Sequence, residues 1–237
     1  MRRLFQRKFL VTGSVFLLLL SVTNSAAQSK DKRSKRIEEA VNVTKIAAGI
    51  IDELTGSQDK PIPKDLFYKA EAVGVFSTTQ NGLFLSGLIG GKGMVCRRTA
   101  SEWGAPVFFE IGGGSAGPQI GSKESGIILF FMNDRAVDWL LEKSLVLQGE
   151  KKAVPGPAGA MTSTSTANIY SYSFDKSKFA GLEYKKLAIF PDNNLNEAVY
   201  AVKAHDILKP SDHSAPLNIP NDFNILLEAL TRAFSRE

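Results

Sequence analysis

The spacing of hydrophobic residues along the chain changes near residue 73. Before that point, residues 37–55 place apolar side chains at three- and four-residue steps, a pattern that predicts an amphipathic helix. Ser34 is a suitable N-cap for this helix, and Gly56 can end it. A short second helix is predicted over residues 64–72, because Pro63 suits the start of a helix.

From residue 73 onward, short apolar or alternating runs are separated by Gly, Asn or Ser, which predicts β-strands. Thirteen of the 20 glycines lie between residues 74 and 126, and glycine relieves crowding where strands bend or bulge. We therefore predict a strongly curved, mainly antiparallel sheet, either open or closed into a barrel. The predicted strands are VGVFST, LFLSGLI, GMVCRR, APVFFEI and GIILFFM, then IYSYSF and GLEYKKLAIF further along the chain.

The remaining segments complete an α+β pattern. Residues 133–143 read as a helix after the glycine-rich strands, and residues 154–168 are rich in turn and hydroxyl residues, which predicts a long loop. Residues 221–234 carry an apolar stripe typical of an amphipathic helix. We predict a single α+β domain over residues 37–237, in which N-terminal and C-terminal helices flank the sheet.

The first 27 residues have the composition of an export signal. Four basic residues precede an apolar run over residues 9–20, and Ser25 and Ala27 occupy the positions that a signal peptidase reads. We expect cleavage after Ala27 and a place in the periplasm or cell envelope; an uncleaved anchor is the alternative. The run is shorter than the roughly 20 residues that span a bilayer, and we expect no transmembrane segment in the mature chain. Cys96 is the only cysteine, which excludes a lipoprotein cysteine after the cleavage point and an intramolecular disulfide.

The formal net charge of +5 is unevenly distributed along the chain. Residues 1–36 hold nine Lys or Arg residues and one acid, which leaves 20 basic and 23 acidic residues in 37–237. A nucleic-acid-binding domain usually carries its basic residues on the fold itself, so we expect no nucleic acid partner. Residues 28–36 are interpreted as a basic flexible arm, either attracted to an anionic membrane surface or simply solvated. Its cations are Lys30, Lys32, Arg33, Lys35 and Arg36.

The stretch EIGGGSAGPQIGS, residues 110–122, contains the G-x-G-x-x-G spacing of a dinucleotide-binding loop. That motif must open a helix after a strand, but here Pro118 and further glycines follow, so no good helix can form. The run GLIGGKG also fails as a phosphate-binding loop, because Gly93 follows Lys92 where Ser or Thr is required. We therefore expect no nucleotide and assign the glycines to sheet geometry, with ligand contact as the alternative.

The sequence lacks a recognisable catalytic set. The only histidines are His205 and His213, and neither belongs to a metal-binding motif. No G-x-S-x-G elbow is present, so a hydrolase that uses Ser115 with one of these histidines is a remote alternative. Cys96 alternates with Met94 along a strand and is interpreted as a core residue. We expect no enzyme activity, no cofactor and no metal.

Several segments occur in the order found in one known family. They are IPKDLFYKAEAVGVF, GGKGMV, WGAPVFFEIGGGSAGPQIGSKESGIILFFMN, GPAG and YSYS with FAG. Over residues 60–235 the chain therefore resembles the SYLF domain family. The resemblance implies a binding module, since eukaryotic members are associated with phosphoinositide membranes and with actin, and bacterial-type members resemble envelope lipid-binding proteins.

These observations predict an exported, non-catalytic module that binds an anionic phospholipid or membrane surface. The basic arm would supply electrostatic attraction, and the glycine-rich sheet would supply contact with the ligand. The candidate lipid-binding residues in the sheet are Lys92, Gly112, Gly113 and Gly114, whose backbone N–H groups could hold a head group. An envelope interaction or scaffold module with a protein partner and no lipid ligand is the alternative.

Overall fold

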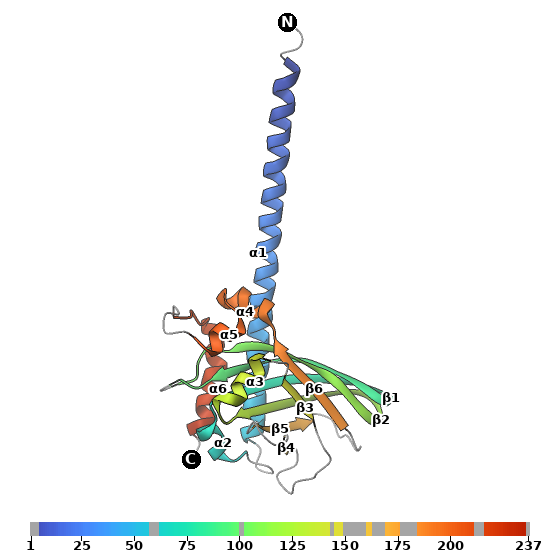
Figure 1. Ribbon diagram of the computed structural model, residues 1–237, viewed down its shortest axis with the longest axis vertical. Coiled ribbons are helices and arrows are strands. Elements are labelled where there is room, and N and C mark those ends of the chain that lie inside the picture. The colour runs from blue at the N-terminus through green and yellow to red at the C-terminus, as the bar shows by residue number, and fades with distance from the viewer. Residues whose placement is uncertain are drawn as a thin grey trace. The chain divides into compact units, whose positions relative to one another are not determined.

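The computed structural model describes residues 5–56, 62–99, 102–142, 145–148, 160–162, 169–175, 184–210 and 216–235. The chain divides into two compact units, Met1–Glu39 and Ala40–Glu237 (Figure 1). The second unit contains the whole sheet and all helices after the first. It is an α+β fold, as the sequence predicts.

Helix α1 spans Phe5–Gly56 and therefore begins well before the predicted start at residue 37. No glycine or proline occurs between residues 14 and 48, so nothing in the backbone interrupts the helix there. Residues 28–36, expected to be a flexible arm, are helical. The predicted end at Gly56 is confirmed. Within the described residues, none of the helices is both long and hydrophobic enough to cross a bilayer.

Two long strands form the centre of the sheet, where the sequence predicts five short ones. Strand β1 spans Ala72–Arg97 and strand β2 spans Val107–Phe131. They pair antiparallel along their whole length, with one irregularity between Phe84 and Ser86. The glycines that separate the predicted short strands lie inside this ladder. The residues on both sides of them remain paired between β1 and β2.

Four shorter strands complete the antiparallel sheet. They are β3 (Leu145–Gln148), β4 (Ala160–Thr162), β5 (Ile169–Asp175) and β6 (Tyr184–Pro191). The order is β3-β6-β2-β5-β4, and β1 lies on the other side of β2. One edge of β2 therefore pairs first with β6 and later with β5, so the sheet must bend along β2. The sheet is strongly curved and open, not closed into a barrel. Strand β4 falls within the predicted loop 154–168, and the other residues of that loop lie outside the described ranges.

Two hydrophobic cores lie on opposite faces of the sheet, because side chains alternate along each strand. Phe108 and Phe130 point into one core, and Phe109 and Phe131 point into the other. The first core is covered by the C-terminal part of α1 and by α2 (Lys64–Lys69), α4 (Asn193–Tyr200) and α6 (Asn224–Ser235), which a 3₁₀ turn, η1 (Asn221–Phe223), precedes. The second is covered by α3 (Asp134–Glu142) and α5 (Ala204–Leu208).

Gly91 and Gly93 allow strand β1 to fold back against itself. A Cβ at Gly91 would lie against the carbonyl oxygen of Ser77, inside van der Waals contact, and 2.9 Å from Thr78 Cα. A Cβ at Gly93 would meet the Val75 carbonyl oxygen in the same way. Neither glycine has a φ in the left-handed region, so close approach of the backbone is what requires them.

Candidate functional site

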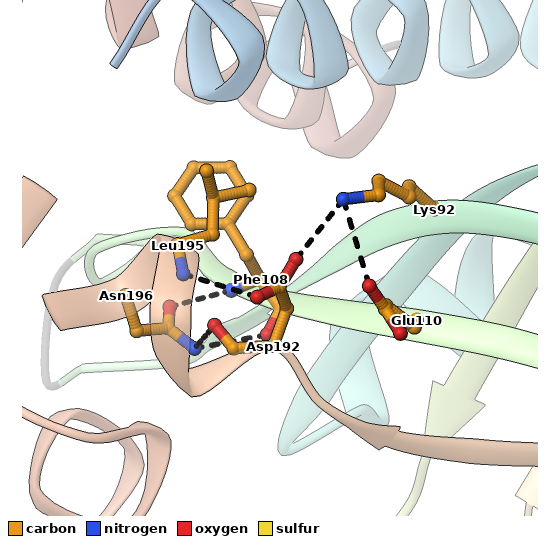
Figure 2. A network of polar contacts seen from close by, with 6 residues as sticks. All are labelled: Lys92, Phe108, Glu110, Asp192, Leu195 and Asn196. Atoms are coloured by element: carbon orange, nitrogen blue, oxygen red, sulfur yellow. Dashed lines mark hydrogen bonds and ion pairs between the residues drawn. The ribbon is translucent and has the colours of Figure 1, made fainter. Parts of the chain in front are cut away.

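Lys92 belongs to a polar network between the sheet and α4, in which it contacts Asp192 and Glu110 (Figure 2). Its Nζ is 3.1 Å from Asp192 Oδ2 and 3.6 Å from Glu110 Oε1. The Lys92 and Glu110 side chains are about two-fifths exposed, whereas the Asp192 side chain is only 9% exposed. Lys92 and Glu110 are direct partners in the β1–β2 register. The two carboxylates therefore outweigh the positive charge of Lys92, and the three side chains carry a net charge of −1.

Asp192 is held in place by the start of α4. Its Oδ1 accepts a hydrogen bond from the Leu195 N–H at 3.0 Å, so the side chain is the N-cap of the helix. The buried Asn196 amide accepts from the Phe108 N–H at 2.8 Å and donates to the Phe108 carbonyl at 3.0 Å. The same Nδ2 donates to the Asp192 carbonyl at 2.9 Å. This amide therefore joins α4 to β2 and fixes the position of the carboxylate that faces Lys92.

Beyond Lys92 and Glu110, the face of the sheet that carries the α1 and α6 core becomes open. The next direct partners on this face are Gly90 and Gly112, then Leu88 and Gly114. Leu88 is 73% exposed, and Phe190, the β6 partner of Glu110, is 38% exposed. We call these five residues, Leu88, Gly90, Gly112, Gly114 and Phe190, the open face.

Packing does not require the glycines of the open face. A Cβ at Gly90 would meet no atom within 4 Å, and one at Gly112 would be 3.9 Å from its nearest neighbours. At Gly114 the nearest atom would be the Gly87 carbonyl oxygen at 3.5 Å, an ordinary contact. None of the three has a φ in the left-handed region. These glycines keep the surface free of side chains, in contrast to Gly91 and Gly93.

The structure brings some of the predicted site residues together and separates others. Lys92, Gly112 and Gly114 share one face of the sheet, whereas Gly113 pairs with Ile89 and Leu187 on the other, buried face. The basic residues 30–36 belong to the unit Met1–Glu39. Because they are helical, and a helix turns about 100° per residue, their side chains point in several directions around its axis. Lys35 forms an exposed ion pair with Asp31 at 2.8 Å.

The chemistry considered for catalysis is not assembled in the described residues. His205 is 68% exposed and lies 3.5 Å from Asp206, and His213 is outside the described ranges. Ser115 is within strand β2, opposite Gly87, and not at a strand-to-helix turn. Cys96 is buried 3.6 Å from Met94 Sδ, and burial raises the pKa of its thiol far above its usual range. No cluster of metal-ligating side chains occurs in the parts of the chain that the structure describes.

Comparison with known proteins identifies the family. The family model Ysc84, described as "Las17-binding protein actin regulator", matches residues 112–233, more than half of the chain. The chain belongs to the Ysc84 family. This assignment confirms the resemblance to SYLF domain proteins. The matched region includes Gly112, Gly114, Asp192 and Asn196, whereas Lys92 and the basic residues 30–36 precede it.

Curated relatives of the Ysc84 family align with most of the chain. SH3 domain-containing YSC84-like protein 1 from Rattus norvegicus is 30% identical over 178 residues, 69% of this chain and 52% of the relative. The Homo sapiens protein of that name is 28% identical over 81% of this chain and 60% of its own length. LAS seventeen-binding protein 3 from Saccharomyces cerevisiae is 26% identical over 68% of this chain and 37% of its own length. The chain thus spans about half the length of the curated relatives it matches. No solved structure matches it.

The sequence predicted only part of this candidate site. Lys92 was found because it follows two glycines, but its partner Asp192 lies 100 residues away, and no local pattern joins the two. A local signal for Asp192 does exist, since an Asp before NNLNEAVY is typical of a helix N-cap. The open face could not be recognised from the sequence. Alternation shows which residues of one strand share a face, but only the pairing register shows which residues of the neighbouring strands lie beside them.

Proposed function

We propose that this Ysc84 family member is a non-catalytic binding module whose ligand lies against the open face. The observation that carries the proposal is the contrast between two sets of glycines. Gly91 and Gly93 are required by backbone packing, but Gly90, Gly112 and Gly114 have room for side chains and lack them. A surface without side chains, beside the exposed Leu88 and Phe190, lets another molecule approach the sheet closely.

The ligand that we propose is an anionic phospholipid or the membrane surface that contains it. Leu88 and Phe190 provide apolar contact area, each side chain contributing at most about 2–3 kcal/mol when fully buried. Asp192 and Glu110 outweigh the single charge of Lys92, so this group does not attract anions and long-range attraction falls to the basic residues 30–36. Their net charge of +4, counting Asp31 against five cations, corresponds to roughly 4 kcal/mol near an anionic bilayer before losses. This attraction should weaken with salt.

Vesicle flotation tests the lipid proposal. The full chain is mixed with vesicles of phosphatidylcholine alone or with phosphatidylglycerol, at low and high salt. We expect flotation with the anionic vesicles that decreases with salt and decreases further in Leu88→Ser. Ile225→Ser is the matched control, because Ile225 is a 44% exposed apolar residue on α6 that does not belong to the open face. Equal flotation of both variants would place the lipid contact elsewhere, and no flotation in any condition would refute the lipid ligand.

A protein partner is the second candidate, favoured by the family description as a Las17-binding actin regulator and by the name of the yeast relative. The same open face would then receive apolar side chains of the partner. Pull-down with the purified wild-type chain should recover one stoichiometric protein, and Leu88→Ser should lose it while Ile225→Ser retains it. Recovery of lipid without protein would favour the first candidate.

We also propose that residues 1–27 direct export to the periplasm or cell envelope. The support is the basic start, the apolar run and the small residues before position 28. Intact mass measurement of the protein from its host tests this. A mature chain that begins at Gln28 in an envelope fraction is expected, and a full-length chain in the soluble cytoplasmic fraction would refute export.

A further inference from the structure

A second candidate site is a cavity of about 670 Å³ on the side of the sheet covered by α3 and α5. It lies between the closed end of the β1–β2 hairpin, the start of α3 and the end of α5. Its volume falls within the roughly 300–1,000 Å³ typical of small-molecule sites. The charged residues that line it are Arg97, Arg98, Asp134, Asp138 and Lys209. None of them belongs to the open face.

The Arg97 guanidinium has one contact that holds it in place and a second contact that a ligand could replace. Its Nη1 donates to the Leu208 carbonyl at 2.8 Å, and Leu208 is 1% exposed, so this contact holds the guanidinium in place. Its Nη2 donates to Asp134 Oδ1 at 2.5 Å. The Asp134 side chain is 69% exposed at the first position of α3, whereas the Arg97 side chain is 28% exposed. The carboxylate can therefore rotate into solvent while the guanidinium stays at the cavity.

The other two cationic residues that line the cavity, Arg98 and Lys209, differ in where their charge lies. The Arg98 guanidinium lies toward the opposite face of the sheet, where it donates to the Phe67 and Ala70 carbonyls and stacks over Trp103 with Cζ 4.5 Å from the ring centroid. It therefore does not serve a ligand in the cavity. Lys209 forms an ion pair with Asp138, and both side chains are about one-third exposed. Apart from Arg98, two cations, Arg97 and Lys209, and two carboxylates line the cavity, a net charge of zero that rises to +1 when Asp134 turns away.

We propose that this cavity binds the phosphate monoester of a small organic group. A phosphate monoester is close to a dianion at neutral pH, and its oxygens can accept charge-assisted hydrogen bonds from Arg97 Nη2, the nitrogen that does not bond to Leu208. The phosphate would replace the Asp134 carboxylate on Arg97, with Lys209 as the second cation. The cavity is larger than phosphate alone requires, and Ile207 and Pro210 contribute apolar lining for the organic part. This proposal does not depend on the ligand of the open face.

Calorimetric titration of the full chain with sn-glycerol 3-phosphate tests the proposal, with glycerol as the uncharged control. Arg97→Gln should weaken binding by about tenfold or more, the equivalent of one lost charge-assisted hydrogen bond. Asp134→Asn should strengthen binding by up to about tenfold, because the competing carboxylate is gone. A merely structural role for the Arg97–Asp134 pair would not produce this gain. Lys69→Gln is the matched control, since it also removes one cation from an exposed ion pair, with Asp65 on α2.

Absence of saturable binding in both the wild type and Asp134→Asn would overturn the proposal, as would equal affinity in Arg97→Gln and the wild type. Flotation with phosphatidylcholine vesicles that contain either phosphatidylglycerol or phosphatidic acid, at matched surface charge, distinguishes the source of the phosphate, because only phosphatidic acid carries a phosphate monoester. Extra flotation with phosphatidic acid that Arg97→Gln abolishes and Leu88→Ser retains indicates a lipid head group in the cavity. Binding of glycerol 3-phosphate without extra flotation indicates a free ester.

Discussion

Two neighbouring glycines provide a direct test of how the β1–β2 ribbon is built. In Gly91→Ala the new Cβ would collide with the Ser77 carbonyl oxygen and lie 2.9 Å from Thr78 Cα, both backbone atoms of the same strand. Neither atom can rotate away, so the two halves of β1 must separate. In Gly90→Ala the Cβ would point to the open face and meet no atom within 4 Å.

The two substitutions should change stability in opposite directions. Overpacking costs typically 1–3 kcal/mol and occasionally more, and a collision with backbone places Gly91→Ala at about 3 kcal/mol of destabilisation. Gly90→Ala should instead stabilise the fold by about 0.5–1 kcal/mol, because glycine in a strand interior loses more conformational entropy than alanine. The difference between adjacent positions is therefore about 3–4 kcal/mol.

Urea unfolding followed by tryptophan fluorescence measures this difference, with the free energy of unfolding obtained by linear extrapolation. Gly93→Ala should resemble Gly91→Ala, because its Cβ would meet the Val75 carbonyl oxygen and lie 2.7 Å from Phe76 Cα. Equal free energies of unfolding for Gly90→Ala and Gly91→Ala would show that β1 does not fold back on itself. The separation of the glycines into two functional sets would then be wrong.

Three further predictions concern stability. Ala201→Gly should raise the melting temperature, because Ala201 ends α4 with a φ of 62°, a left-handed conformation that costs a non-glycine residue roughly 1–2 kcal/mol. Asn196→Ala should lower the free energy of unfolding in urea by about 1–3 kcal/mol, since it leaves the buried Phe108 N–H without its side-chain acceptor, while the Phe108 carbonyl still accepts from the Asp192 N–H. Burial raises the pKa of the Cys96 thiol and of the Tyr200 hydroxyl, so stability should be full below the unfolded thiol pKa of about 8.5 and fall as pH rises above it. Thermal unfolding as a function of pH checks this, and Cys96→Ala should delay the fall until the tyrosine range near pH 10.

The sequence predicted the features of the fold that depend on local alternation. The apolar runs that contain VFFEI and IILFFM were predicted to be strands, and the structure confirms strands there; Phe108 with Phe109 and Phe130 with Phe131 point into opposite cores. The apolar stripe of α6 was equally visible, because helix periodicity needs no knowledge of the partner. The predicted curvature followed from the density of glycine and is confirmed by the change of partner along β2.

The length of the strands could not be predicted from local signals. Asn81 and Gly82 form a dipeptide typical of a tight hairpin turn, yet they pair with Ser122 and Gly121 in a continuous ladder. Whether such a dipeptide turns or extends depends on the partner strand about 40 positions away. The early start of α1 could not be predicted from the apolar pattern, because the helical spacing of apolar residues was recognised only from residue 37 onward. Upstream of residue 37 the helix continues through a segment that has no glycine or proline after residue 13.

The glycines of β1 and β2 show why composition could not decide between a structural and a ligand-binding role. Successive residues of a strand point to opposite faces, so Gly90 and Gly91 are adjacent in sequence and meet different requirements. Gly91 accommodates the backbone of its own strand, and substitution there is limited by collision with Ser77. Gly90 has no such neighbour, and substitution there is limited only by whatever approaches the open face from outside. Side chains introduced at Gly90, Gly112 or Gly114 should therefore weaken ligand binding without lowering the stability of the fold. A side chain introduced at Gly91 should instead lower the stability of the fold.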